Sequence, residues 1–231
     1  MAAPPATFSF VGTVPWGRNR AEYTAFFDLY SVSEQARVLD VGAGPSSFAA
    51  EMASLGRDVV AVDPLYRDNA LAIAERISET RRQVMEGLAR HADRFLWDAY
   101  RDPAHLEEVR LSAMSLFLED LAGPRQGRYL AAALPRLPFA DDSFDLVLIS
   151  HLLFLYSDGL DQTFHQAAVT EALRLSREVR IFPLIDINGL PSPHLQPVRA
   201  AANRMGASAE TRLVPYHFQR GADRMLVLRR S

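Results

Sequence analysis

The sequence contains no cysteine and no lysine. Its 231 residues include 25 basic residues, and every one of them is arginine. The absence of cysteine excludes thiol nucleophiles, disulfide bonds, zinc knuckles and iron–sulfur clusters. The absence of lysine excludes a P-loop lysine, a kinase-type lysine and a Schiff-base lysine. We therefore expect chemistry that uses neither an amine nor a thiol, and we predict no metal site.

A strong charge and a long apolar run are also missing. The formal net charge is -3, which gives no general attraction to nucleic-acid phosphates or to anionic lipid. The longest apolar run, 146–156, is about half of a membrane span, and it contains Ser150 and His151. Residues 1–10 lack the basic and apolar segments of a secretory signal. These features predict a soluble, cytoplasmic protein with neither a nucleic-acid nor a membrane partner.

The chain length and the 48% hydrophobic composition fit a single domain over 1–231. Within this domain, the first strand signals follow one another closely. Residues 37–41 form an apolar run that ends in a glycine-rich turn, 46–55 show helical spacing, and 58–63 form a second apolar run. A strand, turn, helix and strand within 30 residues indicate a right-handed parallel βαβ unit.

Later segments extend this pattern. Further strands are predicted at 129–134, 144–150, 179–185, 211–218 and 224–229, with helices at 162–175 and 195–205. The last two strands flank the turn 220–223, which suggests an antiparallel hairpin. The fold class predicted is therefore α/β, a doubly wound, seven-stranded, mostly parallel sheet with an antiparallel C-terminal hairpin.

Two segments lie outside this alternation. Residues 66–128 form a helical insertion after the second strand, in which apolar residues recur with helical spacing. The insertion is either a packed helical pair or a lid that helps to form a substrate pocket. Residues 1–35 form an N-terminal cap, whose helical face at 23–30 is expected to cover the ligand end of the sheet.

The turn after the first strand is the first place to look for a ligand, because open α/β sheets bind ligands at the carboxyl ends of their strands. Gly42 and Gly44 let a ligand approach the backbone closely. Asp63 follows the neighbouring strand, where a carboxylate can accept hydrogen bonds from ribose hydroxyls. Asp40 would repel a pyrophosphate, so the turn suits a cation. A nicotinamide-dependent oxidoreductase is the alternative, although segment 42–47 lacks the last glycine of that fingerprint.

At this point the sequence resembles the class I S-adenosylmethionine-dependent methyltransferases. The resemblance rests on the segments VLDVGAG (38–44), VAVDP (60–64) and LPFADDSFDLV (137–147), and on the terminal hairpin. It implies a Rossmann-like methyltransferase fold, with S-adenosyl-L-methionine as the methyl donor.

The resemblance also assigns residues to the donor. It places the methionine part beside Asp40, Gly42 and Gly44, and the ribose beside Asp63. The remaining residues implied for donor binding are Ala133 and Leu134 beside the adenine, Ser150 at the end of the fourth strand, and Arg20 beside the carboxylate. Two positions depart from the common pattern, because Ala133 replaces an acidic residue and Ser46 replaces a third glycine. Arg20 is equally well explained as a solvated arginine on the cap.

His151 is the candidate general base, because a neutral imidazole at the end of the fourth strand could take a proton from the acceptor. The alternative is a hydrogen-bonded wall residue. Tyr156, Asp158, Asp186 and Asn188 also fall on loops at this edge, where turn and capping roles are the more common explanation.

The acceptor is predicted to be a small molecule, methylated at oxygen or nitrogen, with a protein side chain as second choice. The segment SHLL (150–153) differs from the Asn/Asp-Pro-Pro-aromatic motif of enzymes that methylate exocyclic amino groups of bases. A catalytically inactive, donor-binding regulatory or partner subunit is the alternative function, with the insertion as an interaction surface. The sequence leaves the acceptor and the oligomeric state open.

Overall fold

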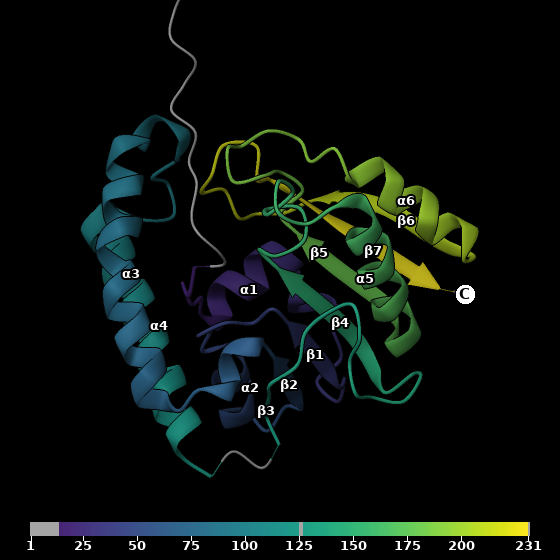
Figure 1. Cartoon of the computed structure of the whole chain (residues 1–231), viewed down its shortest axis with the longest axis horizontal. Helices are drawn as coiled ribbons and strands as arrows, with labels where there is room; N and C mark the ends of the chain where they lie inside the picture. Colours follow the sequence, from purple (N-terminus) through teal and green to yellow (C-terminus); the bar gives the residue numbers. More distant parts are fainter. Residues whose placement is uncertain (1–13, 125–126, 231) are drawn as a thin grey trace, which may run out of the picture.

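The computed structural model describes residues 14–124 and 127–230, so residues 1–13 of the predicted cap and 125–126 of the predicted insertion lie outside the described part. The described chain forms one central sheet with helices on both faces (Figure 1). The strands are β1 (Val38–Val41), β2 (Val59–Val62), β3 (Tyr129–Leu130), β4 (Phe144–Ser150), β5 (Ser176–Phe182), β6 (Ala207–Leu213) and β7 (Arg224–Arg230). The helices are α1 (Arg20–Phe27), α2 (Phe48–Ser54), α3 (Ala70–Arg90), α4 (Pro103–Ala122), α5 (Gln162–Leu175) and α6 (Leu195–Arg204), with short 3-10 helices at Leu29–Ser31, Pro64–Arg67 and Ala92–Arg94.

The sheet has the strand order β3-β2-β1-β4-β5-β7-β6. Strands β1 to β5 pair in parallel, and β7 pairs antiparallel with both β5 and β6. The doubly wound, seven-stranded, mostly parallel sheet with an antiparallel C-terminal end is therefore confirmed. The strand order reverses between β1 and β4, which makes the carboxyl ends of these strands the expected ligand site.

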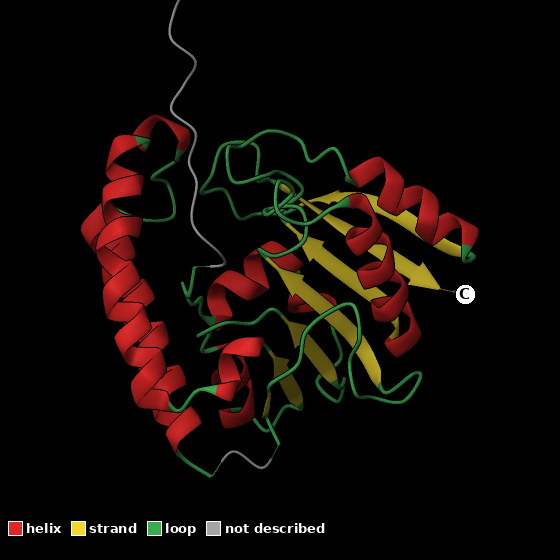
Figure 2. Ribbon diagram, in the orientation of Figure 1, coloured by secondary structure: helices red, strands yellow, loops and turns green. Residues whose placement is uncertain are grey.

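Apolar side chains of the strands alternate between two cores. One core joins the sheet to helices α1 to α4, through residues such as Phe26, Phe48 and Phe117. The other joins it to α5 and α6, through residues such as Val169 and Val198. The loops that follow β4 and β5 and the loop between β6 and β7 gather at one end of the sheet (Figure 2).

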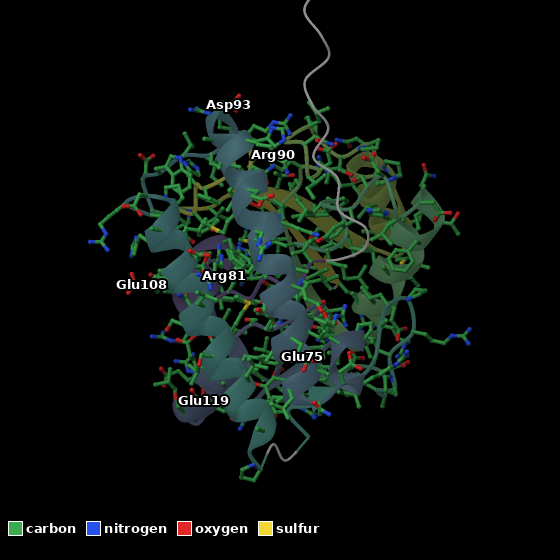
Figure 3. The ribbon with its side chains drawn as sticks, turned by 60° about the vertical axis from the view of Figure 1, so that its left-hand side comes forward. Glu75, Arg81, Arg90, Asp93, Glu108 and Glu119 are labelled. Atoms are coloured by element: carbon green, nitrogen blue, oxygen red, sulfur yellow. The ribbon has the colours of Figure 1, made fainter. Side chains whose placement is uncertain are left out.

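The helices α3 and α4 form a long hairpin where the helical insertion is predicted, and they lie side by side along one flank of the molecule (Figure 1). Each helix begins at a side-chain cap, because Asn69 accepts a hydrogen bond from Ala72 N and Asp102 accepts one from His105 N. The exposed charged residues labelled in Figure 3 lie along the outside of this hairpin. Among the described residues, no helix is long and apolar enough to cross a membrane.

The predicted strand at 211–218 is displaced. The edge strand β6 begins at Ala207 and ends at Leu213, so 214–223 form a loop before β7. Val214, Tyr216 and Phe218 alternate as in a strand and are buried, but Tyr216 and Phe218 face a cavity instead of the sheet. Period-two burial arises equally from a loop that covers a pocket, which explains the difference.

Candidate functional site

A cavity of about 310 Å³ lies at the carboxyl ends of β1, β2 and β4. Its walls come from the turn at residues 42–45 that follows β1 (the glycine turn), the segment before α1, the α3–α4 hairpin, and the loops after β3, β4, β5 and β6. Most of the donor and base residues predicted from the sequence line this cavity: Gly42, Gly44, Asp63, Ala133, Leu134, Ser150 and His151. The fold thus brings together residues that are separated by more than 100 positions in the chain.

Asp40 lies in the middle of β1 and is completely buried. The Tyr23 hydroxyl donates a hydrogen bond to Asp40 Oδ1 at 3.2 Å, whereas Asp40 Oδ2 is buried without a partner in the described chain. Burial raises the pKa of Asp40 to about 8. A buried oxygen without a donor is costly, and a nearby cation favours the charged carboxylate. A cation bound at the glycine turn would therefore stabilise the charged form of Asp40, although Asp40 itself does not line the cavity.

The glycine turn is held open by Asp63. Its carboxylate accepts hydrogen bonds from Gly44 N at 2.9 Å and Leu65 N at 2.8 Å. Gly44 has a φ of +54°, and a Cβ there would meet no atom within 4 Å, so its surface is open toward a ligand. Burial raises the pKa of Asp63, and the two backbone donors oppose this shift. A carboxylate has about four lone-pair directions, so capacity for ligand hydroxyls remains.

The segment before α1 packs directly on the glycine turn. A Cβ on Gly17 would lie 2.0 Å from Pro45 O, so only glycine allows this contact. The next residue, Arg18, lines the cavity. Its carbonyl accepts hydrogen bonds from Ser46 Oγ at 2.7 Å and Ser47 N at 3.1 Å. Serine at position 46, which departs from the family pattern, thus anchors Arg18 beside the turn.

Arg20 does not line the cavity. Its side chain is 46% exposed, and its Nε lies 4.0 Å from Glu51 Oε2. The Arg18 guanidinium is the basic group on the cavity wall near the turn, and its buried Nε has no partner among the residues described. Burial lowers the pKa of Arg18, and the charge of Arg110 adds to the effect. The basic residue before the first strand that lines the cavity is therefore Arg18 and not the predicted Arg20.

Apolar side chains line the cavity on both sides of the glycine turn. Leu134 is buried and Ala133 lies beside it, in the segment that leaves β3. On the other side, Leu152 Cδ2 would lie 2.8 Å from a Cβ on Gly42, whose φ is +68°. No acidic side chain follows β3 at this wall in the described chain, so a ring bound here would be held by apolar contacts and backbone groups.

His151 follows β4 directly, at a left-handed φ of +49°. Its ring packs between Phe26 and Phe182, with centroids at 5.3 and 5.2 Å. Burial lowers the pKa of His151 well below its usual value, and the positive charges of Arg18 and Arg110 lower it further. The imidazole is therefore neutral at physiological pH.

The polar side chains of Ser150 and Tyr23 lie between His151 and Asp40. The His151 Nδ1 lies 2.9 Å from Ser150 Oγ. Ser150 acts on the Tyr23 hydroxyl and lowers its pKa against the raising effect of burial, and the Tyr23 hydroxyl donates to Asp40. When Ser150 donates to Tyr23, its oxygen accepts the Nδ1 proton of His151, and the other ring nitrogen is left as the acceptor.

A buried polar cluster on the hairpin side was not anticipated from the sequence. Arg110 of α4 is 1% exposed and forms an ion pair with Glu22 of α1, which also receives hydrogen bonds from the hydroxyls of Tyr100 and Tyr216. Burial alone would raise the pKa of Glu22, but Arg110 outweighs it and holds the pKa below its usual value. The sequence does carry a signal, since Arg110 shares helical spacing with Leu106 and Phe117 and so falls on the apolar face of α4.

Of the four loop residues predicted to lie at this edge, one lines the cavity wall and the other three do not. Tyr156 lines the cavity, and its hydroxyl accepts a hydrogen bond from Val14 N at 3.3 Å. Asp158 is exposed. Asp186 stabilises a turn, because its Oδ1 accepts hydrogen bonds from Asn188 N and Leu190 N.

Two loops, the α3–α4 connector and the β6–β7 loop, join to form the roof of the cavity. Leu96 N donates to Phe218 O at 2.6 Å, and Arg220 N donates to Arg94 O at 2.9 Å. The rings of Phe95 and Phe218 stack with centroids 4.9 Å apart. The α3–α4 connector and the β6–β7 loop thus form one continuous cover over the cavity. Among the described residues, no three His, Asp or Glu side chains gather as metal ligands would.

Comparison with known proteins identifies one curated relative. The chain is 30% identical over 223 residues to the uncharacterized protein MJ0045 of Methanocaldococcus jannaschii, and the alignment covers 94% of this chain and 96% of the relative. No family model matches the sequence.

Solved structures with the same fold carry methyltransferase names. The magnesium protoporphyrin IX methyltransferase of Synechocystis PCC 6803, with bound S-adenosylmethionine, has a TM-score of 0.50 and 15% identity over 91% of this chain and 78% of its own. A TehB-like S-adenosylmethionine-dependent methyltransferase of Corynebacterium glutamicum has a TM-score of 0.50 and 14% identity over 91% of this chain and 88% of its own. These likenesses confirm the predicted fold.

Proposed function

Because the chain belongs to the same family as this Methanocaldococcus jannaschii protein and has the fold of the class I S-adenosylmethionine-dependent methyltransferases, we propose that it is a methyltransferase with S-adenosylmethionine as donor. The acceptor is an oxygen or nitrogen atom of a small molecule. The observation that carries the proposal is the cavity at the switch point, with Asp63 and the glycine turn at one end and His151 beyond them. Asp40 is buried in β1, two residues before the turn.

The residues present fit this donor. The buried Asp40 carboxylate, whose Oδ2 lacks a partner, attracts the donor's ammonium group at the glycine turn, and the Arg18 guanidinium takes the donor's carboxylate. Asp63 accepts hydrogen bonds from the ribose hydroxyls, and the open surface of Gly44 admits the methionine part. Ala133 and Leu134 border the adenine. Arg20, which the sequence places in the carboxylate role, lies outside this arrangement.

In the proposed mechanism the protein takes little part in the covalent chemistry, because the methyl group passes directly from donor to acceptor. S-Adenosylmethionine supplies a methyl group on a sulfonium, and an acceptor lone pair forms the new bond to carbon while the carbon–sulfur electron pair returns to sulfur. The roof formed by the two joined loops limits the access of water to the reacting groups. The free imidazole nitrogen of His151 takes the acceptor proton, and Ser150 and Tyr23 hold the ring in the required tautomer.

The direct test of activity is a transfer assay. The purified protein is incubated with methyl-labelled S-adenosylmethionine and a fractionated metabolite extract, and labelled products are separated from the donor. We expect label in a small-molecule fraction. Donor binding without transfer to any fraction would contradict the enzymatic proposal and favour the regulatory subunit.

Arg18 and Arg20 give a matched pair for the donor carboxylate. Arg18→Gln is expected to weaken binding of S-adenosylhomocysteine by about 1.5–3 kcal/mol, because a charge-assisted hydrogen bond is lost. Arg20→Gln, two residues away on the surface, leaves the affinity within about 0.5 kcal/mol. Isothermal titration calorimetry measures both. Equal effects of the two substitutions would remove Arg18 from the site.

His151→Asn tests the base without disturbing the backbone, because asparagine also tolerates positive φ. Turnover with the acceptor found in the transfer assay is expected to fall about 10²- to 10⁴-fold, while the affinity for S-adenosylhomocysteine stays unchanged. His217→Asn, at an exposed position of the β6–β7 loop, serves as the control. Unchanged turnover in His151→Asn would show that the histidine is a wall residue.

A further inference from the structure

The cavity has a second end, away from the glycine turn, that is built mainly from apolar side chains. Val84 and Leu88 of α3 and Leu106 of α4 form its hairpin wall, and Phe95 and Phe218 form its roof. Aromatic surfaces of this kind favour flat rings, which pack against them in stacked or edge-on arrangements. The shape and chemistry of this end therefore suit a ring-containing molecule.

The charged side chains of the cavity wall each have a partner when the donor is bound as proposed. In the described chain, the ionised side chains on the cavity wall are Arg18, Asp63, Arg76 and Arg110. The Asp63 carboxylate accepts hydrogen bonds from Gly44 N and Leu65 N, and Arg76 donates to Asp68 at 3.3 Å. The Arg18 guanidinium is the group that pairs with the donor carboxylate in the proposed function. Arg110, the ionised group at the apolar end, is held by Glu22.

The polar groups that remain are uncharged. His151 is neutral, because burial lowers its pKa well below the usual value. Tyr216 also lines the cavity, and burial raises the pKa of its hydroxyl, so it stays protonated. With the donor carboxylate bound to Arg18, a charged acceptor at this end would lose its hydration and find every charged side chain of the wall already paired, which is strongly unfavourable. A hydroxyl group, in contrast, finds a hydrogen-bond partner in the neutral imidazole of His151, whereas the Tyr216 hydroxyl is taken up by Glu22, Arg110 and Tyr100.

We propose that the acceptor is an uncharged aromatic alcohol, such as a phenol, bound with its ring between the α3–α4 hairpin and the roof and its hydroxyl toward His151. This inference rests on the proposed function. The hydroxyl oxygen forms the bond to the methyl carbon, the carbon–sulfur electron pair returns to sulfur, and the hydroxyl proton goes to the imidazole.

Three probes with one ring system and different charges test the inference. 2-Naphthol, 2-naphthoate and 2-naphthylmethylammonium are titrated into the protein saturated with S-adenosylhomocysteine. 2-Naphthol is expected to bind at least about tenfold more tightly than either charged probe. Equal affinities, a tighter charged probe, or no 2-naphthol binding up to about 1 mM would overturn the inference.

The same titrations separate the two proposals. Failure of S-adenosylhomocysteine to bind defeats the proposed function and, with it, the inference. Normal binding of S-adenosylhomocysteine together with the wrong order of probes defeats the acceptor class alone.

A charge placed in the wall should reverse the preference. Leu88→Arg puts a guanidinium into the apolar end, whereas Leu71→Arg places it on the same helix where the leucine is 78% exposed. Leu88→Arg is expected to bind 2-naphthoate more tightly than 2-naphthol, and Leu71→Arg keeps the wild-type order. Retained binding of S-adenosylhomocysteine reports that each variant is folded. An unreversed order in folded Leu88→Arg would contradict the assigned wall.

Discussion

Arg110→Met is expected to lower the free energy of unfolding by about 3–5 kcal/mol, because it leaves the Glu22 carboxylate buried without its counter-ion. Glu22 is 6% exposed, and its remaining partners are the hydroxyls of Tyr100 and Tyr216 and the backbone N–H of Asn19. Urea denaturation at pH 7 measures the change. Arg81→Met is the control, since Arg81 pairs with Glu107 at 2.6 Å on the surface, where loss of a pair costs about 0–1 kcal/mol.

The pH dependence and a double variant identify the cause. Arg110 holds the pKa of Glu22 low, so the stability that this pair contributes is present above the unfolded pKa of about 4.3 and is lost as pH falls through the folded pKa. The difference between wild type and Arg110→Met should therefore shrink below about pH 4. Adding Glu22→Gln should restore part of the lost stability. A loss under about 1 kcal/mol at pH 7 would show that Glu22 is not desolvated as described.

Asp63→Ala is expected to weaken binding of S-adenosylhomocysteine by about 1–3 kcal/mol, or roughly 5- to 150-fold in Kd. The proposed reason is the loss of charge-assisted hydrogen bonds to the ribose. The variant also removes the acceptor for Gly44 N and Leu65 N, which loosens the glycine turn. Asp63→Asn keeps one carbonyl oxygen and should give an intermediate loss.

Asp58 provides the matched control for Asp63. The two acids flank β2, with Asp58 before its first residue and Asp63 after its last. Asp58 is 61% exposed and pairs with Arg37 at 3.2 Å, far from the carboxyl end that forms the cavity. Asp58→Ala should leave the affinity unchanged, and an Asp63→Ala protein that binds as tightly as wild type would refute the ribose role.

The sheet could be predicted from the sequence because its signals are local. A buried parallel strand is a short apolar run, as at β1, β2 and β4, and the turn between β1 and α2 needs glycine at 42 and 44. The parallel crossovers then follow from chain geometry. The same local signals misplace β6, because an apolar roof over a cavity has the periodicity of a strand.

The wall of the site could be predicted only in part, because it depends on contacts between distant segments. Arg18 and Arg20 are both basic residues before the first strand. The contacts of Gly17 and Ser46 hold Arg18, and not Arg20, against the glycine turn. The ion pair of Glu22 and Arg110 joins residues 88 positions apart. No local pattern distinguishes such a pair from solvated charges.

The α3–α4 hairpin shows the same division between local and distant information. Helical spacing predicts both helices within 66–128, but leaves open whether they form a lid or an interaction surface. Val84, Leu88, Leu106 and Arg110 place one side of the hairpin on the cavity wall. The hairpin is thus a wall of the pocket in this structure.

The central claim is that the crevice between β1 and β4 binds an adenosyl ligand. Calorimetric titration of the wild-type protein with S-adenosylhomocysteine at neutral pH tests this claim most directly. The account predicts saturable binding of one molecule per chain, and the absence of binding up to high micromolar concentrations of the ligand would contradict it.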